Sequence, residues 1–280
     1  MKKLLVIGGP TCSGKTDYAF QLARELKTEI ISADARQFYR GMEIGTAQPE
    51  PEMLREIKHH FIGHLQVTET YTAGMFENDV LKLLSELFEK YPVVVMAGGS
   101  GFFIQAVCEG LDNIPADSSI RTQLNNIPLE VLQEELKRKD PQYYDEVDIK
   151  NPRRLQRALE VIRITGQPYS QFRLKKKKIR PFEIEACRLS PDRNVLEQRI
   201  RHRVDQMMQQ GLLEEVKKLR PRRDFNALKT VGYTELFSYL DKEVSLEKAV
   251  EQIKIHTRQY AKRQETWFAA KDMKVIDPNY

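Results

Sequence analysis

The segment Gly8–Thr16, GGPTCSGKT, constrains the fold most strongly, because it follows the apolar run Leu4–Ile7 and matches G-x-x-x-x-G-K-[ST] in full from Gly9 onward. Its glycines let the backbone curl so that N–H groups face an anion, and the positive end of the following helix adds to the attraction. Lys15 supplies a positive charge, and Thr16 offers a hydroxyl to Mg²⁺. The candidate residues for binding a diphosphate, or a nucleotide such as ATP, are Gly9, Pro10, Thr11, Cys12, Ser13, Gly14, Lys15 and Thr16.

Strand-like and helix-like segments alternate along much of the chain. Apolar runs predict strands over 3–7, 29–33 and 93–96, and periodic apolar positions predict helices over 15–27, 49–58, 72–90 and 101–109. Further along, strands are expected over 182–189 and 274–276, and helices over 192–210, 212–219 and 246–268. This alternation predicts an α/β fold, with a P-loop NTPase-like core whose parallel sheet is flanked by helices.

The segment 115–180 departs from this pattern. It shows no strand-like run, and its periodic apolar positions predict helices over 129–138 and 153–164, with Pro, Asn and Gly between them. We therefore predict a small all-helical insertion domain over 115–180. The P-loop catalytic core would be formed by 1–114 and 181–280.

Positive charge is concentrated in the same segment. The net charge of the whole chain is +5, but residues 150–180 hold eleven Lys and Arg residues against the single acid Glu160. The rest of the chain is therefore net acidic. Segregation of this kind favours a polyanionic partner over a merely solvated charged face, and nucleic acid is the partner that we expect.

The cellular context follows from what the sequence lacks. Cys12, Cys108 and Cys187 lie too far apart for a zinc site or a disulfide framework. No stretch approaches the ~18 apolar residues of a membrane span, and no secretory leader is apparent. We therefore expect a cytoplasmic protein with no membrane partner. We also expect a monomer, because no long exposed apolar seam is visible.

Asp34 follows the second predicted strand, at the edge of the sheet where open α/β folds bind ligands. A carboxylate there can accept a proton from an incoming nucleophile, although a helix cap or an outer ligand of Mg²⁺ is the structural alternative. The strand predicted over 93–96 runs into Gly98, Gly99 and Ser100 without a carboxylate. ATP and GTP hydrolases carry an Asp there, so the pattern favours a kinase or a transferase.

Motifs spread in order across nearly the whole chain resemble those of the tRNA dimethylallyltransferase family. They are GPTCSGKT at 9–16, SADARQFYRGMEIGTA at 32–47, YTA at 71–73 with Phe76, AGGSGFF at 97–103, NPRRLQRALE at 151–160, Arg199-Ile200 with Arg203, VGY at 231–233, and TRQYAKRQ at 257–264 with Thr266-Trp267. The family moves a dimethylallyl group from dimethylallyl diphosphate to N6 of the adenine just 3′ of the tRNA anticodon. The resemblance implies that the phosphate loop holds the diphosphate of an isoprenoid, which becomes the leaving group.

The resemblance also implies roles for individual residues, with Mg²⁺ as the cofactor and Thr16 as its ligand. The implied catalytic residues are Asp34, which takes the proton of the adenine amine, Thr11, and Arg203, which adds a cation on the leaving diphosphate. The target base must leave its stack to reach this cleft. The residues implied to bind the tRNA anticodon stem-loop are Asp34, Ala35, Arg36, Gln37, Ser100, Arg121, Arg153, Arg154, Leu155, Gln156, Arg157, Lys229, Val231, Gly232 and Tyr233.

Three alternatives remain open on the sequence. A small-molecule kinase explains the phosphate loop and Asp34 but not the basic segment. A prenyltransferase acting on free adenine nucleotides would carry almost the same motifs, but a mononucleotide does not need a basic surface. A non-catalytic RNA-binding protein explains the charge and leaves the phosphate loop without a purpose.

Overall fold

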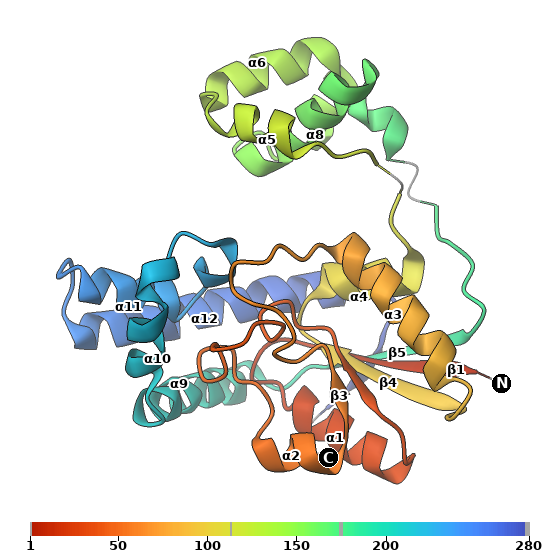
Figure 1. Cartoon of the computed structure of the whole chain (residues 1–280), viewed down its shortest axis with the longest axis vertical. Coiled ribbons are helices and arrows are strands. Elements are labelled where there is room, and N and C mark those ends of the chain that lie inside the picture. The colour runs from red at the N-terminus through yellow and green to blue at the C-terminus, as the bar shows by residue number, and fades with distance from the viewer. Residues whose placement is uncertain (1, 113, 174–175, 278–280) are drawn as a thin grey trace. The chain divides into compact units, whose positions relative to one another are not determined.

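The computed structural model describes residues 2–112, 114–173 and 176–277, and it contains a six-stranded sheet in which every pairing is parallel (Figure 1). The strand order is β3-β2-β4-β1-β5-β6. The strands are β1 (Lys3–Gly8), β2 (Ile30–Ser32), β3 (His59–His60), β4 (Val93–Gly98), β5 (Glu183–Leu189) and β6 (Lys274–Ile276). The predicted α/β fold with a parallel sheet is therefore confirmed.

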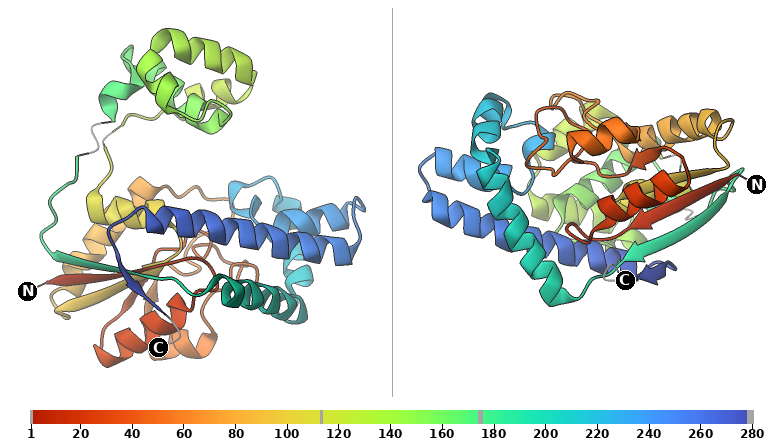
Figure 2. Two further views of the ribbon diagram at one scale, coloured as in Figure 1. Left: turned by 180° about the vertical axis from the view of Figure 1, so that it is seen from behind. Right: turned by 90° about the horizontal axis from the view of Figure 1, so that it is seen from below.

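Helices cover both faces of the sheet, because side chains along each strand alternate between two apolar cores. Leu4, Val6 and Met96 face a large core shared with α3 (Ala73–Leu87), α4 (Gly101–Glu109) and the end of α12 (Leu246–Ala269). Ile7 and Val95 face the opposite core, which contains α1 (Lys15–Glu25). Figure 2 shows from behind that α12 runs along the same face as α4. The remaining helices of the core are α2 (Pro51–Glu56), α9 (Arg193–Gln209), α10 (Leu212–Leu219) and α11 (Tyr233–Leu240).

The chain divides into two compact units, Met1–Cys108 with Arg180–Tyr280 and Glu109–Ile179. The sequence prediction set these borders at 115 and 180. Arg180, which we counted with the basic insertion, belongs to the sheet-containing unit. Its guanidinium donates to the carbonyls of Ala106 and Val107 and to the carboxylate of Glu77, at 2.8–2.9 Å.

The helical unit has its own apolar core, built around α8 (Pro152–Thr165). Its other helices are α5 (Ser118–Asn125), α6 (Leu129–Lys139), α7 (Pro141–Glu146) and the 3₁₀ turn η1 (Tyr169–Phe172). Asp117, Asp140 and Asn151 cap the N-termini of α5, α7 and α8 through their side chains. In the described part of this unit no strand occurs, as predicted.

Several short elements were not predicted: β3, α5, α7, α11, η1 and the 3₁₀ turns η2 (Arg220–Arg222) and η3 (Asn226–Leu228). All of them have at most eight residues, and β3 has only two. Most predicted elements differ from the observed ones by one to three residues at their ends. Among the described residues, no helix is both long and apolar enough to cross a membrane.

Candidate active site

Three loops meet at the carboxyl edge of the sheet, after β1, β2 and β4. They contribute the phosphate loop, Asp34 and the Gly98–Ser100 turn. A cavity of about 450 Å³ lies along this edge, and a smaller one of about 100 Å³ adjoins it. Thr11, Asp34 and Arg203 line both cavities. The structure therefore brings together all three residues predicted to be catalytic, in the sheet-containing unit.

The phosphate loop is closed on itself and buried around its tip. Lys15 Nζ donates to the Pro10 carbonyl at 3.1 Å, which holds the ammonium group over the loop. Cys12 adopts a left-handed backbone (φ +62°) and packs against Leu196 and Ile200. The buried Ser13 Oγ has no hydrogen-bond partner in the described chain. A buried hydroxyl without a partner is costly, so an anion in the loop would satisfy it.

The electrostatics of the cavity favour an anion. Desolvation lowers the pKa of Lys15, the negative charge of Asp34 acts to raise it, and the positive charge of Arg203 lowers it further. Arg203, on α9, also points its guanidinium at Thr11 Oγ1, 3.4 Å away. The positive charges of Lys15 and Arg203 repel each other here, and the negative charge of a diphosphate would stabilise both.

Asp34 is half-buried at the end of β2, and its Oδ1 accepts the backbone N–H of Arg36 at 3.1 Å. Thr11, Lys15 and Arg203 line the same large cavity. This geometry places a carboxylate beside an anion site, as a proton acceptor for a nucleophile requires.

The residues that follow Asp34 are held mainly by the protein itself. The N–H of Ala35 donates to Ser100 Oγ at 2.9 Å, and Gln37 Nε2 donates to the Ala47 carbonyl at 2.8 Å. Arg36 donates to the carbonyl of Asn226 at 3.1 Å. Their predicted contacts with RNA stay predictions, and in this structure these groups shape the wall of the cleft.

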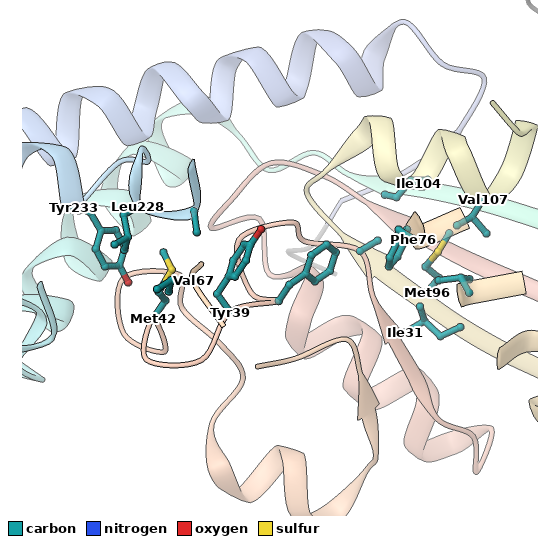
Figure 3. Close-up of a cluster of buried hydrophobic side chains, with 14 of the residues drawn as sticks. Ile31, Tyr39, Met42, Val67, Phe76, Met96, Ile104, Val107, Leu228 and Tyr233 are labelled. Atoms are coloured by element: carbon teal, nitrogen blue, oxygen red, sulfur yellow. The ribbon is translucent and has the colours of Figure 1, made fainter. Parts of the chain in front are cut away.

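Nothing in the sequence indicated how the loop around Gly45, which lines the two cavities, is held in place. Glu215 accepts the N–H groups of Ile44 and Gly45, both at 2.9 Å, and the hydroxyl of Tyr233 at 2.6 Å. A Cβ on Gly45 would lie 2.5 Å from the Tyr233 hydroxyl, so only glycine fits there. Figure 3 shows the ring of Tyr233 next to Met42.

The ring of Tyr233 is fully buried in the core, and the predicted contact of this residue with tRNA stays a prediction. Its neighbours differ from it: Lys229 is exposed, and Val231 and Gly232 line the smaller cavity. The VGY motif at 231–233 thus combines a tyrosine that packs in the core with two residues that line the smaller cavity.

In the helical unit, Glu160 ties down two of the predicted tRNA ligands. Its fully buried carboxylate accepts from Arg121 at 2.9 Å, from Arg157 at 2.9 Å and from the N–H of Asp117 at 2.8 Å. Burial acts to raise the pKa of Glu160, but these hydrogen bonds outweigh it and lower the pKa. Arg157 also donates to the carbonyls of Ile114 and Pro115, so it fastens the start of the unit to α8.

The remaining α8 residues divide by exposure. Leu155 is fully buried, and Gln156 donates to the Leu124 carbonyl at 3.4 Å; the predicted contacts of both residues with tRNA stay predictions. Arg153 and Arg154 are exposed, and their side chains form no hydrogen bond or ion pair with the described residues. Lys175 of the basic run lies outside the described residues.

The IPP transferase family model matches residues 37–271. The chain belongs to this family. The resemblance found in the sequence motifs is confirmed, and the chain is an enzyme, a transferase. The match begins after the phosphate loop, but relatives extend the similarity over nearly the whole chain.

Similar members of the family are about equally long. The tRNA dimethylallyltransferase 1 of Bacteroides fragilis (strain YCH46) is 46% identical over 272 residues, covering 95% of this chain and 90% of that protein. The tRNA dimethylallyltransferase of Christiangramia forsetii is 47% identical over 270 residues, covering 95% and 89%.

Solved structures agree with the family assignment. The full-length tRNA isopentenylpyrophosphate transferase from Bacillus halodurans is 36% identical with a TM-score of 0.73, covering 99% of this chain and 90% of that one. A eukaryotic dimethylallyltransferase solved acting on tRNA is 26% identical with a TM-score of 0.85, covering 99% and 74%. The P-loop-like core expected from the sequence is the fold of these transferases.

Proposed function

We propose that this chain transfers a dimethylallyl group from dimethylallyl diphosphate to N6 of the adenine 3′ of the anticodon in tRNA. The observation that carries the proposal is that Thr11, Asp34 and Arg203 line both adjoining cavities. One cavity contains the phosphate loop, and the acid stands between the two. The transfer needs a site for the leaving diphosphate and a proton acceptor close to each other.

In the reaction, the bond between C1 of the dimethylallyl group and the diphosphate oxygen breaks, and its electron pair leaves with the diphosphate. N6 of adenine forms a bond to C1, and the proton of N6 passes to the carboxylate of Asp34. The adenine amine is a weak nucleophile, so holding it against C1 supplies much of the rate. The base reaches the cleft only when it has left its stack.

The leaving diphosphate is stabilised by the loop. Lys15, Arg203 and the hydroxyls of Thr11 and Ser13 face the place where negative charge develops. Thr16 lines the same cavity and would hold Mg²⁺ together with the diphosphate, where the ion would neutralise part of the charge. The described residues contain no cluster of three or more His, Cys, Asp or Glu side chains that could bind a metal by themselves.

The helical unit binds the anticodon stem-loop through cations that have no partner among the described residues. Arg153 and Arg154 at the start of α8 supply this charge, and Lys229 adds to it from the sheet-containing unit. In this proposal the enzyme acts as a monomer in the cytoplasm. ATP is a competitor for the phosphate loop rather than a substrate.

The test is to incubate the protein with Mg²⁺, dimethylallyl diphosphate and unmodified tRNA whose anticodon is followed by adenine, and to weigh the nucleosides after digestion. An adenosine heavier by one dimethylallyl group, dependent on both substrates, supports the proposal. Modification of free AMP, ADP or ATP alone would replace tRNA as the acceptor. Consumption of ATP without any prenylated product would instead support the small-molecule kinase alternative.

A further inference from the structure

Gln264, on α12, joins two loops of the active site with a single side chain. Its Oε1 accepts the backbone N–H of Thr11 at 2.8 Å, and its Nε2 donates to the carbonyl of Gly99 at 2.8 Å. The side chain is buried, with 6% of its surface exposed. Both ends of the amide therefore bond to the backbone of the site.

The Gly99 turn is shaped to admit this amide. A Cβ on Gly99 would lie 2.3 Å from Gln264 Nε2 and 3.6 Å from Asp34 Oδ2. Any side chain at Gly99 would therefore push the amide away. The amide also lies close to the carboxylate that we propose as the proton acceptor.

The two bonded loops carry the reacting groups. Thr11 belongs to the phosphate loop, and its hydroxyl faces Arg203. The turn that contains Gly99 leads into Ser100, whose N–H donates to the carbonyl of Ala33, next to Asp34. A shift between the two loops would change the distance between the leaving group and the proton acceptor.

We propose that Gln264 is a positioning residue that fixes the phosphate loop against the turn beside Asp34 and so sets the geometry of transfer. The proposal rests on the proposed function. Gln264 acts through Thr11 and Gly99 and touches no reacting atom. Replacing it with an apolar residue leaves the partly buried N–H of Thr11 without this acceptor, which relaxes the loop.

The decisive variant is Gln264→Glu, because its effect depends on protonation. As a carboxylate the new group accepts from Thr11 N–H but opposes the carbonyl of Gly99, whereas as a neutral acid it accepts from one and donates to the other. Burial and the nearby Asp34 raise the pKa of the new carboxyl group, so its neutral form should become populated as the pH falls. Gln264→Leu removes both bonds at every pH.

The measurement is kcat for tRNA prenylation, taken as the ratio of variant to wild type at each pH so that other titrating groups cancel. Gln264→Leu should lower kcat about 10- to 100-fold with the KM for tRNA changed less than about twofold, as expected for misplaced groups. The ratio for Gln264→Glu should rise severalfold as the pH falls. The matched control is Gln252→Glu, on the same helix and away from both cavities, whose ratio should stay flat.

A ratio for Gln264→Glu that does not change with pH would overturn the proposal, even if Gln264→Leu fails to fold. So would a kcat for Gln264→Leu equal to that of wild type. Calorimetry with inorganic diphosphate and Mg²⁺ separates this proposal from the proposed function, because it needs no transfer. If wild type binds diphosphate without prenylating tRNA, and Gln264→Glu weakens that binding only at high pH, the positioning role stands and the proposed function falls.

Discussion

The cleft at the sheet edge and the basic surface of the helical unit were both predicted from charged and polar residues, but the structure uses these residues differently. In the cleft, the loops after β1 and β2 and the helix α9 bring Thr11, Asp34 and Arg203 to the same two cavities. In the helical unit, Arg121 and Arg157 are bound to the buried Glu160, and Arg153 and Arg154 remain open. The cleft is thus recognised by the three residues that meet in it. The candidate RNA surface is recognised by Arg153 and Arg154, which have no partner among the described residues.

The largest effect is expected for Asp34→Ala, which tests whether the cleft contains the reacting groups. If Asp34 takes the proton of the adenine amine, kcat should fall by roughly 10²–10⁴ while tRNA still binds. Single-turnover prenylation and a tRNA binding titration measure the two effects. Asp224→Ala, which removes an exposed acid of the same unit, should leave both unchanged. Near-normal turnover of Asp34→Ala would take Asp34 out of the reaction.

Glu160→Gln tests whether the paired arginines are structural. The change removes the charge that holds Arg121 and Arg157, and hydrogen bonds to charged groups are worth about 2 kcal/mol in the free energy of unfolding. Both arginines are partly exposed, so Arg121→Ala should cost less, about 1 kcal/mol. Amide hydrogen exchange in α5 and α8 reports these losses. Unchanged exchange in both variants would mean that the network does not stabilise the unit.

Removing Arg153 and Arg154 together should weaken tRNA binding and reduce the slope of log Kd against log salt by about 2, one for each phosphate contact. The matched control is the pair Lys137→Ala and Arg138→Ala on α6, exposed cations of the same unit. If both double variants change the slope equally, the unit attracts RNA by net charge alone. A slope equal to that of wild type would show that α8 does not contact phosphate.

The local features of the sheet-containing unit were predictable because the signal is contained in short stretches. The phosphate loop and Asp34 stand at the ends of apolar runs, which gave both the fold and the edge where ligands bind. The bounds of α4, α10 and β6 were predicted to the residue. In contrast, α11 begins at Tyr233 after Gly232 at φ +95°, and the motif there gave no hint that the ring faces the core.

Long-range pairings were beyond the sequence. Gln264 lies 253 residues from Thr11, so nothing local indicates their bond. Glu160 was counted only as one acid among eleven cations, yet it is fully buried and binds one of them, Arg157, together with Arg121 from outside that segment. A charge count gives the sign of a surface but cannot tell which charges are already neutralised inside the protein.

The smallest expected effect concerns acid stability, and it distinguishes the two regions by pH. His64, in the sheet-containing unit, packs against Phe38, Phe61 and Tyr71 at ring distances of 5.3–5.5 Å, and neither ring nitrogen has a hydrogen-bond partner in the described chain. Desolvation lowers the pKa of His64 below 6.5, although Asp79 and Glu69 act to raise it, and Arg40 adds to the lowering. His64 therefore takes up its proton at a lower pH in the folded unit than in the unfolded chain.

Because the unfolded chain takes up the proton near pH 6.5, the free energy of unfolding should fall as the pH drops below that value, by less than about 1.4 kcal/mol for each pH unit. His64→Phe should remove this loss, so the difference in the free energy of unfolding between variant and wild type, taken from urea titrations, should widen from pH 7.5 to pH 5 at no more than that rate per pH unit. The pKa of Glu160 is lowered instead, so its contribution is present above 4.5 and is lost only as the pH falls below that value. Mild acid should therefore loosen the sheet-containing unit first, and exchange in α8 accelerating before that near His64 would reverse this order.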